Sequence, residues 1–536
     1  MSCLPVRGRI ANRLFAGIFS VVIGTSSLAA AAPPYPPRLK VCFVSLNEPH
    51  EIEAFRASLD PRQFEFVDIR AVAAAARPRS FGAPATADDT WLADACTPQT
   101  TCDVAVYSAE FAGRFFGKGG PSLSLQAMEE ASCQPRCAGL FRQPQEVFLL
   151  ACNTLANKNE DSRTPEEYLR VLLDHGFDQA SAERVVQLRY GPLGPSFRES
   201  LRRIFAGVPR IYGFSSVAPR GEYTGPMLSR YLRSKRDYAA SLIRTAGTTT
   251  RNDALLAAFK GTALTQTTGL TQAEAGAMDR QHICALYDET NSVAERLNIV
   301  YGLLLRPDAL TFVPTLQVFL SRHPPASLSK REKAILAQIQ GLDDARDAVL
   351  DLVKRLDVSA LKLELAHFAM LVSWLDRSEF HTLAVDGARK LLGEYLTTEV
   401  VDIMCEITKH EPLRGDFTAN DIPAAIYREP EGLRLLACLA PSDPKVIPHV
   451  IPALDSTDPV NRNWAAHTLT RLQPTDKDVL ARLVPYLRDP SIEISSRIRW
   501  IFQVQRTIPR GIEGEIRRVD PGLLRERAAR VAMVKR

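Results

Sequence analysis

The sequence predicts a two-part protein: an α/β domain with a mainly parallel, three-layer sheet arrangement, followed by an all-α region of repeated helical pairs. Three observations lead to this fold class. Short apolar runs alternate with helical patterns from residue 33 to about residue 220, which is typical of a parallel sheet covered by helices. Beyond about residue 225, helical periodicity continues almost to the end of the chain. Near that end, Asp458-Pro459 and Asp489-Pro490 stand 31 positions apart between helical stretches.

Length and composition set the frame for this prediction. A chain of 536 residues is too long for one ordinary domain and suggests about two to four. Its 46% hydrophobic and 24% charged residues exclude a disordered, collagen-like or polytopic membrane chain. The net charge is +5, but three of the 66 basic residues lie in the first 32 positions, which leaves 63 against 61 acidic residues. So small an excess gives no electrostatic reason to expect nucleic acid or an anionic membrane as a partner.

The first 32 residues have the pattern of an export signal. Arg7, Arg9 and Arg13 precede an apolar run over residues 14–23, and small residues then lead to Pro33. This pattern predicts a secretory signal peptide over residues 1–32, with an uncleaved anchor as the alternative. No later segment reaches the roughly 18 apolar residues that a membrane span requires. We therefore expect an exported bacterial protein, periplasmic or extracellular, with no membrane span after signal cleavage.

Five strands and a well-marked helix define the predicted α/β domain, residues 33–225. The helix begins at Thr164-Pro-Glu-Glu167, a capping box with proline in the first turn, and ends at Gly176,. Two or three helices should occupy residues 161–207. The predicted strands share an apolar, β-rich character and are residues 40–45, 64–69, 103–107, 146–151 and 209–214.

Residues 226–290 are predicted to be a helical connector that could belong to either part. From residue 291 to 536 we expect helical repeats. In the clearest two units, an apolar helix precedes each Asp-Pro pair, and a second helix follows it, over residues 460–472 and 491–504. A helical pair of this size cannot bury its apolar face alone, so it stacks on its neighbours.

Residues 443–505 resemble the HEAT repeat, and residues 292–442 resemble it more weakly. This resemblance implies a solenoid whose concave surface binds a protein or peptide partner.

The cysteines fit an oxidising compartment. Nine remain when Cys3 in the signal segment is set aside, and an odd number leaves at least one thiol free or paired between chains. Local clustering predicts disulfides between Cys96 and Cys102 and between Cys133 and Cys137. Zinc is the competing interpretation, but a second pair at C-x₂₋₄-C spacing and an H-x₃₋₅-H pair are both missing from the sequence,. We expect neither a metal nor a cofactor.

Candidate reactive residues follow the third and fourth predicted strands. Ser108-Ala-Glu110 comes after the third strand, and Cys152-Asn-Thr comes after the fourth. In an open parallel sheet, ligands and reactive groups gather beyond the carboxyl ends of the strands. An apolar strand ending in Ala-Cys-Asn-Thr resembles the caspase-like cysteine peptidases, in particular the bacterial branch that includes the CHAT peptidases. The resemblance covers about residues 38–220.

This resemblance implies that Cys152 is the nucleophile and that a histidine from the turn after the preceding strand activates it. Here Glu110 occupies that histidine position. A thiol needs a base or a positive field to ionise at neutral pH, and a carboxylate beside it opposes ionisation. The expected catalytic pair is therefore broken. His50, which follows the first strand at the same sheet edge, is an alternative base, since the first and third strands are neighbours in the family.

The substrate cleft implied by the family would be lined by residues near the strand ends: Ser108, Gly113, Asn153, Ser215 and Ser216. Backbone amides near Gly113 would hold an oxyanion. The alternative for Cys152 is a buried or disulfide-bonded cysteine without a chemical role.

Two functions follow. The first is a pseudo-peptidase that serves as a protein-binding scaffold through its helical repeats. The second is an active secreted cysteine peptidase that uses Cys152 with a base from outside the family pattern, such as His50.

Overall fold

The computed structural model describes residues 38–46, 49–76, 91–117, 122–159, 163–235, 237–277, 279–357, 359–505 and 507–534. The predicted signal peptide, residues 1–32, lies outside these ranges. None of the helices in them is long and apolar enough to cross a membrane.

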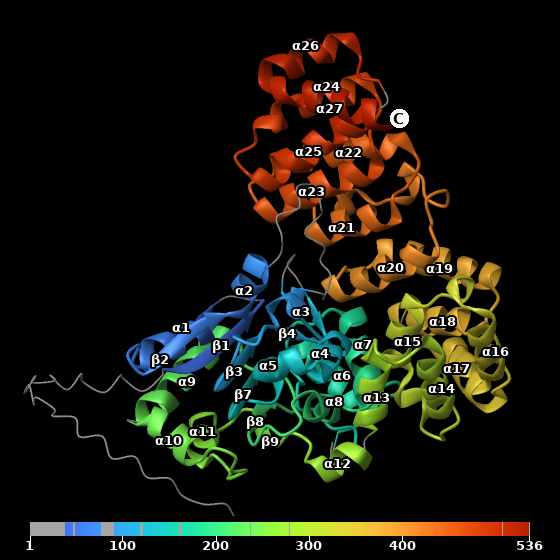
Figure 1. The fold of residues 1–536 in the computed structure, drawn as a ribbon. Coiled ribbons are helices and arrows are strands. Elements are labelled where there is room, and N and C mark those ends of the chain that lie inside the picture. Colours follow the sequence, from blue (N-terminus) through green and yellow to red (C-terminus); the bar gives the residue numbers. More distant parts are fainter. Residues whose placement is uncertain are drawn as a thin grey trace, which may run out of the picture. The chain divides into compact units, whose positions relative to one another are not determined.

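A six-stranded sheet organises the N-terminal part of the described chain (Figure 1). Its strands pair in parallel except for the last, which is antiparallel to its neighbour. Adjacent strands in space are β2 (Phe64–Asp68), β1 (Leu39–Ser45), β3 (Val104–Ser108), β7 (Glu146–Leu150), β8 (Ile211–Phe214) and β9 (Leu264–Thr267). The five strands predicted from the sequence are all present, so the mainly parallel α/β domain is confirmed.

Two features of the sheet region differ from the prediction. Strand β9 lies beyond residue 225, where we expected no further strand. Its Leu-Thr-Gln-Thr sequence lacks an apolar run because it is an edge strand with only Thr267 buried. The segment after Gly113, for which no strand was predicted, contributes to a small antiparallel sheet. That sheet comprises β4 (Glu110–Phe111), β5 (Arg114–Phe116) and β6 (Leu123–Ser124).

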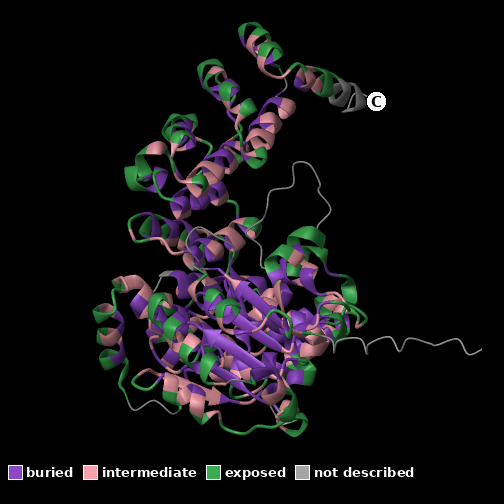
Figure 2. Cartoon of the chain, turned by 90° about the vertical axis from the view of Figure 1, so that its left-hand side faces the viewer, coloured by how far each residue is buried: buried purple, intermediate pink, exposed green. Residues whose placement is uncertain are grey.

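Helices cover both faces of the large sheet because successive side chains of each buried strand point to opposite faces. The helices on one face are α1 (His50–Ser58), α9 (Gly221–Ser234), α10 (Tyr238–Arg244) and α11 (Asp253–Ala258), and Val41 and Phe43 of β1 pack against them. The helices on the other face include α2 (Ile69–Ala76), α3 (Trp91–Ala95), α4 (Leu125–Cys133), α5 (Ala138–Phe141) and α8 (Phe197–Ile204), and Cys42 and Val44 pack against these. Figure 2 shows the strands buried between the two groups of helices.

The helix predicted from residue 164 is confirmed as α6 (Pro165–Asp174). Thr164 accepts a hydrogen bond from the Glu167 amide at 3.2 Å, and the Glu167 carboxylate accepts one from the Thr164 amide at 2.9 Å. Gly176 adopts a φ of 87° where the chain leaves the helix. Helices α7 (Gln179–Tyr190) and α8 complete the predicted set before β8.

From residue 293 onward the described chain is helical, and its buried side chains form one continuous apolar cluster. Successive helices stack on one another near the end of the chain: residues 430–439 pack on 459–472, these on 492–504, and these on 521–534. Helices α12 (Gln272–Ala277) and α13 (Arg280–Tyr287) precede this region. Its helices are α14 (Val293–Leu304), α15 (Val313–Arg322), α16 (Lys330–Gln340), α17 (Asp343–Arg355), α18 (Ser359–Leu371), α19 (Arg377–Leu392), α20 (Thr398–His410), α21 (Pro430–Leu439), α22 (Ile447–Val450), α23 (Pro459–Leu472), α24 (Lys477–Leu483), α25 (Ile492–Val504), α26 (Arg510–Val519) and α27 (Pro521–Val534).

The Asp-Pro pairs mark helix starts, as predicted. Asp458 caps α23 by accepting a hydrogen bond from the Val460 amide at 2.9 Å. The Asp489 carboxylate likewise accepts one from the Ser491 amide at 2.8 Å, just before α25. These carboxylates satisfy backbone donors that a helix start leaves without partners.

Four disulfides join the described cysteines, and they correct the predicted pairing. The four cysteines expected to form disulfides all do so, but not with their neighbours in sequence. The bonds are Cys42–Cys102, Cys96–Cys137, Cys133–Cys284 and Cys405–Cys438. The partners follow from the fold: β1 lies beside β3 in the sheet, and α13 packs on α4. Four disulfides fit an oxidising compartment.

A buried ion-pair cluster connects the small sheet to the helical region. Asp402 on α20 accepts hydrogen bonds from Arg114 of β5, from Arg434 of α21 and from the Ser122 hydroxyl, the last at 2.6 Å. The side chains of Arg114, Arg434 and Asp402 are 15%, 7% and 11% exposed. This carboxylate therefore holds charged groups from both parts of the chain.

Candidate functional site

Cys152 lies in a tight turn directly after β7, as the sequence predicted. The turn is bonded to the neighbouring strand: the Leu155 amide donates to the Phe214 carbonyl at 2.9 Å, and the Phe214 amide donates to the Thr154 hydroxyl at 3.1 Å. A side chain at Gly213 would collide with this turn, since its Cβ would lie 2.6 Å from the Thr154 hydroxyl oxygen. Glycine at this strand position lets the Cys152 turn close against β8.

Asn153 fixes the backbone beside the cysteine. It has a φ of 61° and is completely buried. Left-handed backbone is uncommon outside glycine, although asparagine tolerates it better than most residues. Its Oδ1 accepts hydrogen bonds from the Tyr168 hydroxyl and, at 2.9 Å, from Arg189, which lies over the Tyr168 ring. Asn153 is therefore part of the framework that holds the turn.

Cys152 is the free cysteine of the described chain; the residue is partly exposed, whereas its sulfur is largely withdrawn from solvent. Its Sγ accepts a hydrogen bond from the Ala218 amide at 3.3 Å. Burial of the sulfur raises the pKa of Cys152, the Ala218 bond partly opposes this, and the Glu110 carboxylate adds to it. The net direction is upward, so the thiol is held protonated at neutral pH.

Glu110 lies on β4, directly after β3, and its carboxylate acts electrostatically on the Cys152 thiol. Glu110 is an exposed residue, but partial desolvation of its carboxyl raises its pKa, and the nearby Glu431 carboxylate raises it further. Glu431 belongs to the first turn of α21, in the helical region. The carboxylate that acts on Cys152 is thus itself influenced by a carboxylate from the helical region.

His50 is the first residue of α1 and packs against the start of α9. A Cβ on Gly221 would lie 3.1 Å from Cδ2 of His50 and 3.2 Å from a carboxylate oxygen of Glu51. His50 thus lies at the carboxyl edge of the sheet, where the sequence placed it. The Cys152 thiol interacts with the Ala218 amide, the Glu110 carboxylate and the Tyr168 hydroxyl.

The residues expected to line a cleft form hydrogen bonds or turns within the protein. Ser108 is buried and donates a hydrogen bond to Glu51 at 3.0 Å. The Ser216 hydroxyl is buried and accepts one from Arg163 at 2.9 Å. Ser215 donates to the Ala263 carbonyl at 3.3 Å, and Gly113 forms the β4–β5 turn with a φ of 91°. Together with Asn153, these groups stabilise the strand ends.

Sequence reasoning missed three important groups around this edge. Glu51 is a buried carboxylate that accepts hydrogen bonds from Ser108 and, at 2.5 Å, from Thr224. Arg189 braces the turn, and Glu431 comes from a helix far along the chain. None of them carries a local sequence signal: each is a single charged residue in a helical stretch. Only the fold brings them near the strand ends.

The site thus belongs to an α/β protein with a mostly parallel sheet, a cysteine at a strand end and an all-helical region that follows. The geometry offers a weakly acidic, poorly nucleophilic thiol beside a carboxylate. No family model, curated protein or solved structure matches this chain.

Proposed function

We propose that this chain is a protein-binding scaffold built on a caspase-like domain with an impaired peptidase site. In this proposal, the helical region is a HEAT-like solenoid that binds a protein or peptide partner, and the protein acts after export. The observation that carries the proposal is the environment of Cys152. Its thiol is held protonated beside Glu110, where a peptidase of this type needs an activating imidazole.

The neighbourhood of β1, β3 and β7 supports the caspase-like part. In that family, the first and third strands are neighbours, and the catalytic residues follow the third strand and the strand beside it. Here β1 pairs with β3, and β3 pairs with β7, which leads to Cys152. The stacking of α21, α23, α25 and α27 supports the repeat part, because stacked helical pairs present an extended surface to a partner.

An active peptidase is the second candidate, and the position of His50 favours it. The His50 ring lies against Gly221, three residues beyond Ala218, whose amide contacts the thiol. A movement that brought the His50 imidazole to the sulfur would supply a base. Such a base would withdraw the thiol proton and allow attack on a peptide carbonyl.

A cleavage assay on the full chain separates the two candidates. A mixture of peptides is incubated with wild type, Cys152→Ser and His50→Gln, and new termini are identified by mass spectrometry. The scaffold proposal predicts that wild type and Cys152→Ser give the same products. Cleavage that disappears in both variants would overturn it and establish the His50-dependent peptidase.

Glu110→His is the matched gain-of-function variant, because it restores the residue type that the family has at this position. Cleavage by this variant alone, lost again when Cys152→Ser is added, supports a peptidase geometry impaired at one residue. Inactivity of the folded Glu110→His variant would refute the proposed correspondence between Glu110 and the catalytic histidine.

A further inference from the structure

A basic cavity lies in the helical region, at the junction of α20, α21 and α23. Its volume is about 300 Å³, at the lower end of the range for small-molecule sites. Three of the residues that line it are Lys409, Arg414 and Arg471, and none is acidic. The cavity is therefore a concentrated positive site in a chain that is close to electrically balanced.

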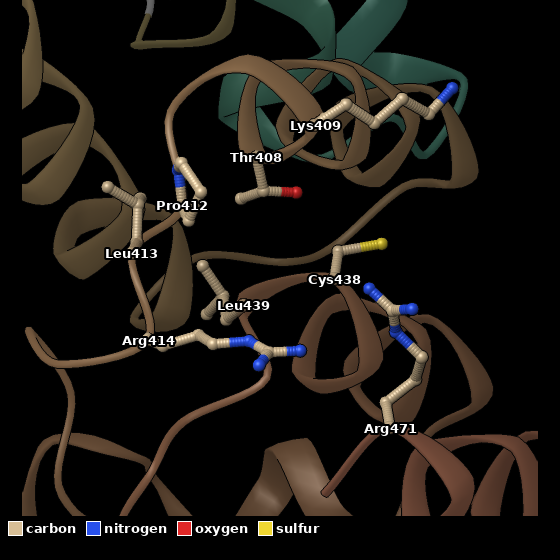
Figure 3. A pocket seen from close by; sticks show the side chains of 8 residues that line it. All are labelled: Thr408, Lys409, Pro412, Leu413, Arg414, Cys438, Leu439 and Arg471. Carbon is tan, nitrogen blue, oxygen red and sulfur yellow. The ribbon is translucent and has the colours of Figure 1, made fainter. Parts of the chain in front are cut away.

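The two arginines converge on the same space. Figure 3 shows the guanidinium groups of Arg414 and Arg471 turned toward one another beside Cys438, whereas the Lys409 ammonium points away. Lys409 contacts the Glu406 carboxylate at 2.8 Å. Within the described residues, no ion pair joins Arg414 or Arg471 to a carboxylate, so their charge is available to a ligand.

The walls that carry the arginines are fixed in place. The Cys405–Cys438 disulfide joins α20 to α21. The loop with Arg414 is held because its carbonyl accepts hydrogen bonds from the amide and hydroxyl of Ser442, at 2.8 and 3.0 Å. Arg471 is oriented by a contact from its Nε to the Ala437 carbonyl at 3.4 Å. A preformed wall lowers the entropy cost of binding.

We propose that this cavity binds a tetrahedral oxyanion of the phosphate class. Guanidinium groups present paired N–H donors that match phosphate oxygens, and charge-assisted bonds of this kind are the stronger class of hydrogen bond. Pro412, Leu413 and Leu439 also line the cavity, and Pro412 is the exposed one of these three. Its ring gives the cavity an apolar wall for the carbon part of a phosphate ester. The site lies outside the α/β domain and does not depend on the chemistry of Cys152.

Calorimetric titration of the full chain tests this site with two probes, inorganic phosphate and phenyl phosphate. Loss of one charge-assisted contact costs enough to weaken binding about tenfold or more. We expect Arg414→Gln and Arg471→Gln each to raise Kd by that factor. Both arginines are exposed, so the substitutions should leave the fold intact, which urea unfolding verifies. Arg510→Gln, at an exposed arginine that starts α26, is the matched control and should bind as wild type does.

The two probes distinguish the source of the oxyanion. Tighter binding of phenyl phosphate indicates a phosphate ester that uses the apolar wall, and equal binding indicates a free oxyanion; either result supports the site if the two arginine variants weaken it. Absence of binding by both probes to wild type, up to about 10 mM at low ionic strength, would overturn the proposal. Equal Kd values in wild type and both pocket variants would overturn it as well.

Discussion

Replacing Asp402 with asparagine should severely destabilise the junction between the small sheet and the helical region. Asp402 is 11% exposed and accepts hydrogen bonds from Arg114, Ser122 and Arg434. Removing one partner of a buried ion pair costs about 3–5 kcal/mol, because the opposite charge stays buried without compensation. Asparagine keeps one oxygen acceptor, so we expect the lower end, about 3 kcal/mol. That is a large fraction of the roughly 5–15 kcal/mol that stabilises a typical domain.

Urea unfolding followed by tryptophan fluorescence measures this loss. Trp464 is well placed as a reporter, since the Arg434 guanidinium lies 5.4 Å from its ring centroid. Asp347→Asn is the control, because Asp347 forms an ion pair with Arg346 in which the two side chains are 70% and 36% exposed. Exposed pairs contribute about 1 kcal/mol or less. A loss for Asp402→Asn no greater than that for the control would refute the assignment of Asp402 as a buried link.

Three further predictions concern one disulfide, His467 and the acidic neighbour of the thiol. Replacing both cysteines of the disulfide between α4 and α13 with alanine should lower the free energy of unfolding by up to about 5 kcal/mol, since it opens a loop of 151 residues,; an unchanged urea midpoint would contradict this. Burial, with Arg497 nearby, lowers the pKa of His467 to about 3. As the pH falls, the unfolded state therefore binds a proton at a higher pH than the folded state does. The contribution of this group to the free energy of unfolding is fully present above about pH 6.5 and should decline toward pH 3 by up to about 1.4 kcal/mol per pH unit. His467→Gln should reduce that slope, whereas a substitution of the exposed His282 should not. Glu110→Gln should lower the pKa of the Cys152 thiol only slightly, because burial is the larger cause of its elevation,; alkylation rates that match wild type at every pH would contradict it.

The parallel strands were predictable because their runs are apolar on both faces, as a sheet covered by helices requires. Strand β9 was missed because an edge strand needs no such run. The strands of the small sheet are two or three residues long, too short to show a periodicity. Helix starts with a local signal, such as the capping box before α6 and the Asp-Pro pairs, were predicted correctly.

Only part of the candidate site could be predicted from the sequence. The strand-end rule located Cys152 and Glu110, because both follow buried strands directly. Glu431 and the disulfide partner Cys284 lie more than a hundred residues from the groups they meet, so only the folded chain brings them there. Ser108 and Asn153, which were expected to line a cleft, form hydrogen bonds within the protein, since residues after strands can hold a turn as readily as they can line a cleft.

The pH dependence of Cys152 alkylation in the folded protein tests the central claim most directly. Peptide mass spectrometry reads the rate with iodoacetamide, and Cys152→Ser is the control for other thiols. The account predicts a thiol that titrates above its ordinary pKa of about 8.5 and a rate that is unchanged in His50→Gln. A thiol that titrates well below that value, and loses its reactivity in His50→Gln, would contradict the scaffold account and support the peptidase.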